Sequence, residues 1–159
     1  MPVSAQVQID IEAPAQVVWA AMVDFERYGE WNPFIVHVET DRLSSPAPEI
    51  GDPLVLHVEW VGGEGSQRSG ERITAFSPPT ETQGGELSYR FTGPMHALGL
   101  VRAKRVQRVQ VLEDGGCRYS SVEVFRGLLT SALPLAQVQA GFEAHAEALK
   151  EWVEGQVQG

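Results

Sequence analysis

The chain has 159 residues, a length that predicts one domain, and its 43% hydrophobic and 21% charged residues are ordinary for a globular protein. Its 21 acidic against 12 basic residues give a net charge of −9, which argues against a nucleic-acid surface and against docking on anionic lipid. The only cysteine, Cys117, leaves no partner for a disulfide within the chain. No apolar run approaches the ~20 residues that span a membrane. The opening residues lack a signal-peptide pattern, so we expect a cytoplasmic protein without stable membrane anchoring.

The first forty residues predict a strand followed by two short helices. Residues 3–12 alternate apolar and polar side chains, which is typical of a half-buried strand. Pro14 then opens a helix as its first residue, and Asp24 caps a second, shorter helical piece that Gly29 ends. We expect the side chain of Asn32, which precedes a proline, to tie the turn into the next strand.

The middle of the chain predicts six further strands with short polar connections. The predicted strands are residues 34–40, 54–60, 67–76, 86–92, 102–112 and 117–125. Phe34, Val36 and Val38 form the inward row of the first, and residues 43–53 form a loop rich in serine and proline. The turn at residues 113–116 is a clear hairpin signal. Consecutive strands with such connections predict an antiparallel meander.

Residues 133–153 predict one long amphipathic helix. Large apolar side chains recur there at steps of three and four, with His145 in the one gap: Leu135, Val138, Phe142, Leu149 and Trp152. The other face, which includes Gln139 and Lys150, is polar and predicted to be wet, and Gly155 is a predicted stop. A helix of ~20 residues is ~30 Å long. Its apolar stripe therefore needs a broad sheet to cover it, and a wedge between sheet and helix can hold a ligand.

This order of elements, together with several local motifs, resembles a known superfamily. The motifs are Ile11-Glu12-Ala13-Pro14, Val18-Trp19, Asp24, Tyr28, Trp31-Asn32-Pro33-Phe34, Gly51, Asp114-Gly115-Gly116, Glu123-Val124-Phe125, Gly127-Leu128-Leu129, Gly141-Phe142-Glu143 and Ala148-Leu149-Lys150. The chain resembles the START-like, helix-grip superfamily (SRPBCC), which includes the birch-pollen-allergen fold and the polyketide cyclase/dehydrase-like proteins.

The resemblance implies one α+β domain over residues 1–159. Its seven-stranded antiparallel sheet would curl around the long C-terminal helix, with two short helices after the first strand. The superfamily includes lipid and hormone carriers, aromatase/cyclases, oxygenase domains and co-chaperone-like proteins, so fold analogy leaves the activity open.

Alternation along three strands predicts a polar cluster inside the wedge. Tyr89, Arg105, Gln107, Ser121 and Glu123 all fall on inward rows. A buried carboxylate must be paired or protonated, so Glu123 could orient a ligand or, with Tyr89, act in acid–base chemistry. The alternatives are a structural ion pair or side chains that reach solvent. A register slip of one residue would turn all five outward.

For three histidines, a structural role is a simpler interpretation than metal binding or proton transfer. His37-Val38-Glu39 and His57-Val58-Glu59 place two His and two Glu on one outer face, a ligand set that zinc accepts, but cross-strand His–Glu pairs are the simpler reading. We therefore predict no metal site. His145 is expected to be a core residue with one satisfied nitrogen, and a proton donor in the pocket is the alternative. No catalytic triad or phosphate-binding loop is visible, so no cofactor is predicted.

The favoured function is non-enzymatic binding of a small hydrophobic molecule (a lipid, an isoprenoid or an aromatic polyketide-like compound) by a monomer or homodimer. The predicted ligand-binding residues are Phe34, Val36, Leu56, Trp60, Tyr89, Phe91, Arg105, Glu123, Val138, Phe142 and His145. One alternative is a polyketide cyclase or dehydratase that moves protons with Glu123 or Tyr89. Another is a co-chaperone-like interaction module, which would need a filled cavity and an exposed apolar patch.

Overall fold

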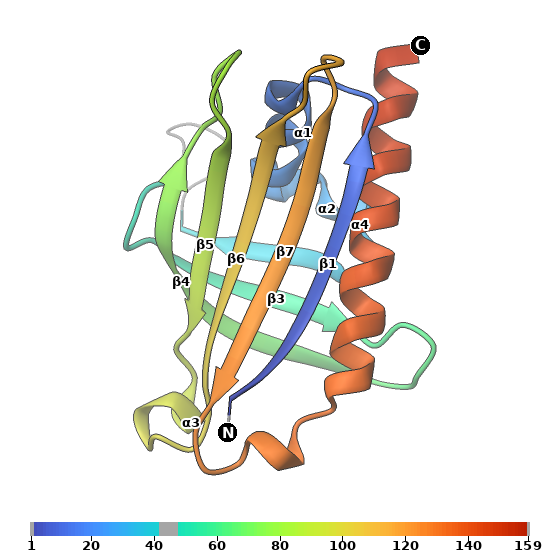
Figure 1. Ribbon diagram of the computed structural model, residues 1–159. Coiled ribbons are helices and arrows are strands. Elements are labelled where there is room, and N and C mark those ends of the chain that lie inside the picture. Colours follow the sequence, from blue (N-terminus) through green and yellow to red (C-terminus); the bar gives the residue numbers. More distant parts are fainter. Residues whose placement is uncertain (1, 42–47, 159) are drawn as a thin grey trace.

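The computed structural model describes residues 2–41 and 48–158, and its seven antiparallel strands wrap around one long helix (Figure 1). The strands are β1 (Val3–Ile11), β2 (Ile35–Thr40), β3 (Pro53–Glu59), β4 (Ser66–Ser77), β5 (Gly85–Phe91), β6 (Arg102–Val111) and β7 (Cys117–Arg126). They are ordered β1-β7-β6-β5-β4-β3-β2, so the first two strands are the edges of the sheet. The predicted α+β helix-grip fold is confirmed. Part of the loop predicted at 43–53 lies outside the described residues.

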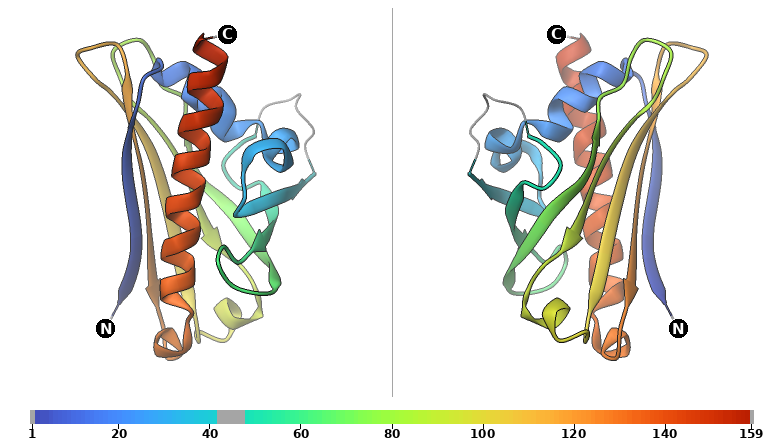
Figure 2. Two further views of the ribbon diagram at one scale, coloured as in Figure 1. Left: turned by 90° about the vertical axis from the view of Figure 1, so that its right-hand side faces the viewer. Right: turned by 90° about the vertical axis from the view of Figure 1, so that its left-hand side faces the viewer.

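The longest helix lies within the curve of the sheet, and shorter helical elements lie beside it and at one end of the molecule. They are α1 (Ala15–Val23), the 3-10 turn η1 (Phe25–Arg27), α2 (Tyr28–Trp31), α3 (Pro94–Ala97), the 3-10 turn η2 (Thr130–Ala132) and α4 (Leu135–Gln158). Figure 2 shows α1 and α2 beside the C-terminal half of α4, whereas only α3 and η2 lie at the other end. No helix among the described residues is long and apolar enough to cross a membrane.

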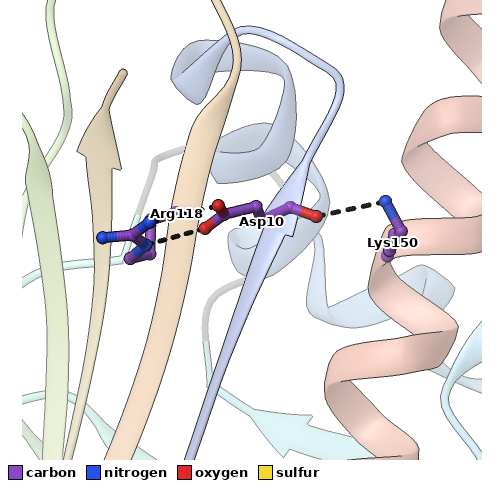
Figure 3. Close-up of polar contacts among 3 residues, drawn as sticks. All are labelled: Asp10, Arg118 and Lys150. Carbon is purple, nitrogen blue, oxygen red and sulfur yellow. Dashed lines mark hydrogen bonds and ion pairs between the residues drawn. The ribbon is translucent and has the colours of Figure 1, made fainter.

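Polar side chains of α4 bind the backbone of the edge strand β1. The Gln139 amide accepts from the Gln6 N–H at 2.9 Å and donates to the Gln6 carbonyl at 2.7 Å. Lys150 Nζ donates to the Asp10 carbonyl at 3.1 Å, while Asp10 itself pairs with Arg118 of β7 (Figure 3). The polar face of α4 is thus not wholly exposed to solvent. Part of it forms hydrogen bonds with backbone groups of β1 that have no partner in the sheet, because β1 is an edge strand.

The buried stripe of α4 follows the predicted spacing but runs further. Val138, Phe142, His145 and Leu149 are buried as expected, whereas Trp152 is only partly buried and Val153 is fully buried. The predicted stop at Gly155 is wrong, because the helix continues to Gln158. No positive φ occurs at Gly155, so the backbone there does not make the left-handed turn with which glycine ends a helix.

A β-bulge corrects the predicted inward row of β2. The register with β3 shifts between Ile35 and His37, which leaves Val36 as the extra residue. Phe34, Ile35 and Val38 are buried, whereas Val36 is only partly buried. Strict alternation fails here because a bulge changes which residues face inward.

The short elements differ slightly from the sequence-based expectations. Pro14 is the N-cap of α1 and not its first residue, and its carbonyl accepts from the Val17 N–H at 3.0 Å. Asp24 precedes η1 but makes no capping side-chain hydrogen bond. One helical turn, α3, forms where only a loop was expected.

Two glycines of α4 provide a matched stability test. A Cβ on Gly141 would overlap the ring of Phe34, whereas a Cβ on Gly155 meets nothing within 4 Å. We expect Gly155→Ala to stabilise the protein by ~0.5–1 kcal/mol through helix propensity. Gly141→Ala should destabilise it by ~1–3 kcal/mol, because Phe34 must move. Denaturant unfolding measures both free energies of unfolding. If the two substitutions stabilised the protein equally, the Phe34 ring could not lie as close to Gly141 as the structure shows.

Candidate functional site

A cavity of about 220 Å³ lies between the sheet and the N-terminal half of α4. Nine of the eleven predicted ligand-binding residues line it: Phe34, Leu56, Trp60, Tyr89, Phe91, Arg105, Glu123, Val138 and Phe142. Further walls come from residues that were not predicted, including Ile35, Val58, Glu71, Met95 and Ala103. Val36 and His145 are not among the lining residues. Ile35 takes the place of Val36 because of the bulge in β2.

Arg105 is the polar centre of the cavity wall. It is 2% exposed; its Nε donates to Ser121 Oγ at 2.8 Å and its Nη1 donates to the Tyr89 hydroxyl at 3.0 Å. Its guanidinium carbon lies 4.2 Å from the centroid of the Phe142 ring, in cation–π contact. In the sheet register, Arg105 faces Tyr89 of β5 and Glu123 of β7. The structure therefore brings together the polar cluster that alternation predicted.

Gln107 and Ser121, two members of that cluster, lie in the solid core and hold the other polar side chains in place. The Tyr119 hydroxyl donates to Gln107 Oε1 at 2.6 Å, and Gln107 Nε2 donates to the Tyr89 hydroxyl at 3.5 Å. Neither Gln107 nor Ser121 lines the cavity. Burial, opposed by the nearby Arg105 charge, raises the pKa of the Tyr89 phenol, so Tyr89 stays protonated and can donate.

His145 lies behind Arg105 in the core. Its Nδ1 is 3.3 Å from Asn32 Nδ2 and 3.4 Å from Arg105 Nη2, and since both neighbours are donors, Nδ1 is the acceptor. Its Nε2 has no hydrogen-bond partner among the described residues. Burial, reinforced by the Arg105 charge, lowers the pKa of His145 well below its ordinary value, so the ring is neutral. The expectation of a core histidine with one satisfied nitrogen fits this geometry better than a pocket proton donor.

Asn32 fixes the position of His145 relative to the sheet. Its Oδ1 accepts from the backbone N–H of Phe34 at 2.9 Å and of Ile35 at 3.0 Å, as expected for a side chain that ties the turn. Its amide nitrogen then faces His145. One buried asparagine thereby connects the start of β2 with α4.

Glu71 is the site residue that sequence reasoning missed. It is 5% exposed and lines the cavity; Ser69 Oγ donates to its Oε1 at 2.9 Å, while its Oε2 has no partner among the described residues. Burial, with a contribution from Glu123, raises the pKa of Glu71 to about 8. The sequence predicts a strand over residues 67–76 but assigns no role to Glu71. Glu71 lies two residues before Ile73, so both side chains point to the same face of the strand. Because Ile73 is buried, this spacing could have indicated that Glu71 faces inward.

Glu123 is the second carboxyl group on the cavity. Burial raises its pKa to about 7, and the Arg105 charge opposes the shift. Arg105 supplies one permanent positive charge, and like charges on Glu71 and Glu123 raise one another's cost of ionisation. The cavity wall therefore presents one permanent cation and two carboxyl groups whose pKa values are raised toward neutral pH.

The repeated His-Val-Glu motifs lie on the outer face as predicted. Glu39 Oε2 is 3.2 Å from His57 Nε2 and 2.6 Å from Arg68 Nη2. The His37 and His57 rings pack with centroids 4.9 Å apart. In the ranges that the structure describes, no group of three or more His, Cys, Asp or Glu residues is arranged to hold a metal ion.

One long helix gripped by a seven-stranded sheet, with a cavity between them, is the architecture of START-like, helix-grip proteins. The family model described as "Polyketide cyclase / dehydrase and lipid transport" matches residues 2–158. The chain belongs to this family, which supports a hydrophobic ligand-binding or cyclase-type role. A comparison with curated proteins gives no match.

Solved structures of low sequence identity share the fold. Norcoclaurine synthase from Thalictrum flavum is 15% identical, with 99% of this chain and 97% of that chain covered and a TM-score of 0.70. The Zhui aromatase/cyclase from Streptomyces sp. R1128 is 18% identical, with 99% and 94% covered and a TM-score of 0.67. Major latex-like protein 151 from Panax ginseng is 8% identical, with 96% and 97% covered and a TM-score of 0.72. At these identities, the likeness establishes the fold alone.

The raised pKa of Glu71 predicts a pH-dependent stability. Its folded pKa of about 8 exceeds the ordinary value of 4.5, so the neutral acid favours folding; this stability is complete below pH 4.5 and is lost as the pH rises through 8. Glu71→Gln removes this titration while keeping the shape of the side chain. We expect the variant to lose less stability than the wild type between these pH values, by on the order of a few kcal/mol.

Thermal unfolding at several pH values measures this difference. The exposed Glu113, in the β6–β7 turn, provides the matched control Glu113→Gln, which should keep the wild-type profile. Parallel profiles for wild type and Glu71→Gln would contradict a buried carboxyl group that titrates near pH 8.

Proposed function

We propose that the cavity binds a small, mainly apolar molecule that places one polar group at Arg105, Glu71 and Glu123. The observation that carries this proposal is Oε2 of Glu71, which lies in the cavity wall and has no hydrogen-bond partner among the described residues. An unsatisfied buried polar atom costs ~1–3 kcal/mol. A ligand that hydrogen-bonds to this carboxyl group recovers that cost, which favours a polar end group over a pure hydrocarbon.

The size and walls of the cavity narrow the class of ligand. Its volume of about 220 Å³ lies below the ~300–1,000 Å³ of pockets for drug-sized ligands, so a long-chain lipid does not fit whole. The rings of Phe34, Trp60, Phe91 and Phe142 supply flat apolar walls. Arg105 donates hydrogen bonds, and a protonated carboxyl group both donates and accepts. Together these features favour a compact aromatic, polyketide-like compound or a short isoprenoid with a hydroxyl or carbonyl group.

Filling the cavity tests this binding function directly. Ala103 lines the cavity from β6, so Ala103→Phe places a ring in the space. We expect at least a tenfold loss of affinity for 1-naphthol, ~1.4 kcal/mol, in a fluorescence titration. The control Gln110→Phe adds the same ring at an exposed position of β6 and should bind like the wild type. Equal affinity of all three proteins would reject the cavity as the binding site.

A cyclase-type enzyme is the second candidate, and the two carboxyl groups favour it. Glu123 and Glu71 have pKa values of about 7 and about 8, near the range in which an acid–base catalyst both takes up and releases a proton. Tyr89 and Arg105 lie beside them as donors to a developing oxyanion. The co-chaperone-like alternative has less support, since it required a filled cavity.

Proton exchange on a model ketone separates the enzyme from the carrier. If the site moves protons, it should accelerate deuterium exchange at the acidic C1 position of 2-tetralone, followed by NMR. We expect Glu123→Gln to lower this rate ~100-fold or more even when the ketone concentration saturates the variant, so that the loss reflects proton transfer and not weaker binding. If the wild type binds 2-tetralone but deuterium exchange is no faster than without protein, the enzymatic function is rejected and the binding function remains.

A further inference from the structure

Exposed apolar side chains gather on two loops at one end of the molecule. Among the described residues, six large hydrophobic side chains are exposed, and four lie here: Met95, Leu98, Leu128 and Leu129. Leu98 is 71% and Leu128 is 81% exposed. Single exposed leucines need no explanation, but several on adjoining segments mark an interaction surface.

The two loops touch each other and border the cavity. The Leu129 N–H donates to the Leu100 carbonyl at 3.0 Å, and Gly127, at a φ of +119°, passes so close to Leu100 that no Cβ would fit. Met95 and Pro134 are both exposed and both line the cavity, so the cavity reaches the surface between these loops. Figure 1 shows α3 and the segment before α4 at the end of the molecule opposite the C-terminus.

Four basic side chains lie beside these loops on the outer face of the sheet. Arg90 is the cross-strand neighbour of Lys104, and Arg102 is that of Arg126. Like charges directly opposite each other destabilise a sheet. No carboxylate in the described part of the chain forms an ion pair with any of the four. Folding alone gives no reason for this arrangement.

The sequence around these residues lacks acidic side chains. Neither residues 87–112 nor residues 124–142 contain an Asp or Glu, although the whole chain carries a net charge of −9. Charges further away than the Debye length of ~8–10 Å are largely screened at physiological salt. The loops at this end and the strand ends beside them therefore carry basic residues and no acidic ones of their own, although the chain as a whole is acidic.

We propose that this end of the protein docks on the surface of an anionic lipid bilayer. Leu98 and Leu128 would enter the headgroup region, while Arg90, Arg102, Lys104 and Arg126 contact lipid phosphates. Leucines that project from loops suit a bilayer better than a rigid protein groove. In this orientation the mouth of the cavity would also face the lipid bilayer, in which an apolar ligand dissolves. Membrane docking is a function separate from ligand binding in the cavity, because docking requires no particular ligand.

Vesicle co-sedimentation tests the proposal with no cavity ligand present. The wild type should bind vesicles of equal parts phosphatidylcholine and phosphatidylglycerol at low salt, bind phosphatidylcholine vesicles far less, and dissociate at high salt. Leu128→Glu, and separately Arg102→Gln with Arg126→Gln, should each lower the partition coefficient about tenfold or more. Thermal unfolding verifies that both variants fold.

Matched controls sit elsewhere on the surface. Val157→Glu introduces the same charge change at a half-exposed apolar position near the other end, and Arg68→Gln with Arg72→Gln removes two exposed charges from β4. Both controls should bind vesicles like the wild type. Absence of wild-type binding, or equal losses in patch and control variants, would overturn the proposal. Retention on poly-L-glutamate beads without vesicle binding would overturn it in favour of an acidic protein partner. None of these outcomes bears on the 1-naphthol titration, so cavity function is judged separately.

Discussion

The buried charge of Arg105 constrains the whole interior. A guanidinium group cannot be deprotonated in a protein, and an unpaired charge in a low-dielectric interior is very costly. Ser121, Tyr89 and the neutral ring of His145 surround it with oxygen and nitrogen acceptors, and Phe142 covers its face. On the cavity side, Glu71 and Glu123 line the same wall as Arg105, and these three side chains make up the charged part of the cavity.

This constraint determines how deeply α4 enters the sheet. His145 and Phe142 must both reach Arg105, and they lie nearly one helical turn apart, on the same face. Asn32 holds His145 from the other side and anchors the start of β2 through two backbone hydrogen bonds. The absence of a side chain at Gly141 lets the Phe34 ring lie against the helix. The edge strand β1 then closes on α4 through Gln139 and Lys150.

Periodicity in the sequence predicted most of this arrangement, because side chains on regular strands and helices alternate in fixed ways. It placed Tyr89, Arg105, Gln107, Ser121 and Glu123 on one face, and the register joins them as expected. The prediction failed where the backbone is irregular. The bulge at Val36 shifted the inward row of β2. No periodic pattern announces a bulge, since the extra residue has no required identity.

Glu71 and His145 show a different limit. A carboxyl group in a strand rich in polar residues does not itself indicate burial, and Glu71, which lines the cavity, was overlooked because only its shared face with Ile73 pointed inward. His145 was correctly placed on the buried stripe of α4, but helical spacing cannot tell cavity from core. That distinction depended on Asn32 and Arg105, which are distant in sequence and which occupy the space around Nδ1.

The cavity lies at one end because the helices that fill the sheet are unequal. At the C-terminal end of α4, the nine-residue α1 packs with η1 and α2 into a solid core with Ala146, Leu149 and Val153. At the other end, α3 and η2 have only four and three residues, so they close the sheet without filling it. Short turns with exposed leucines bury little apolar surface, and the cavity reaches the surface beside them at Met95 and Pro134. The same shortage of packing that creates the cavity therefore also provides its entrance.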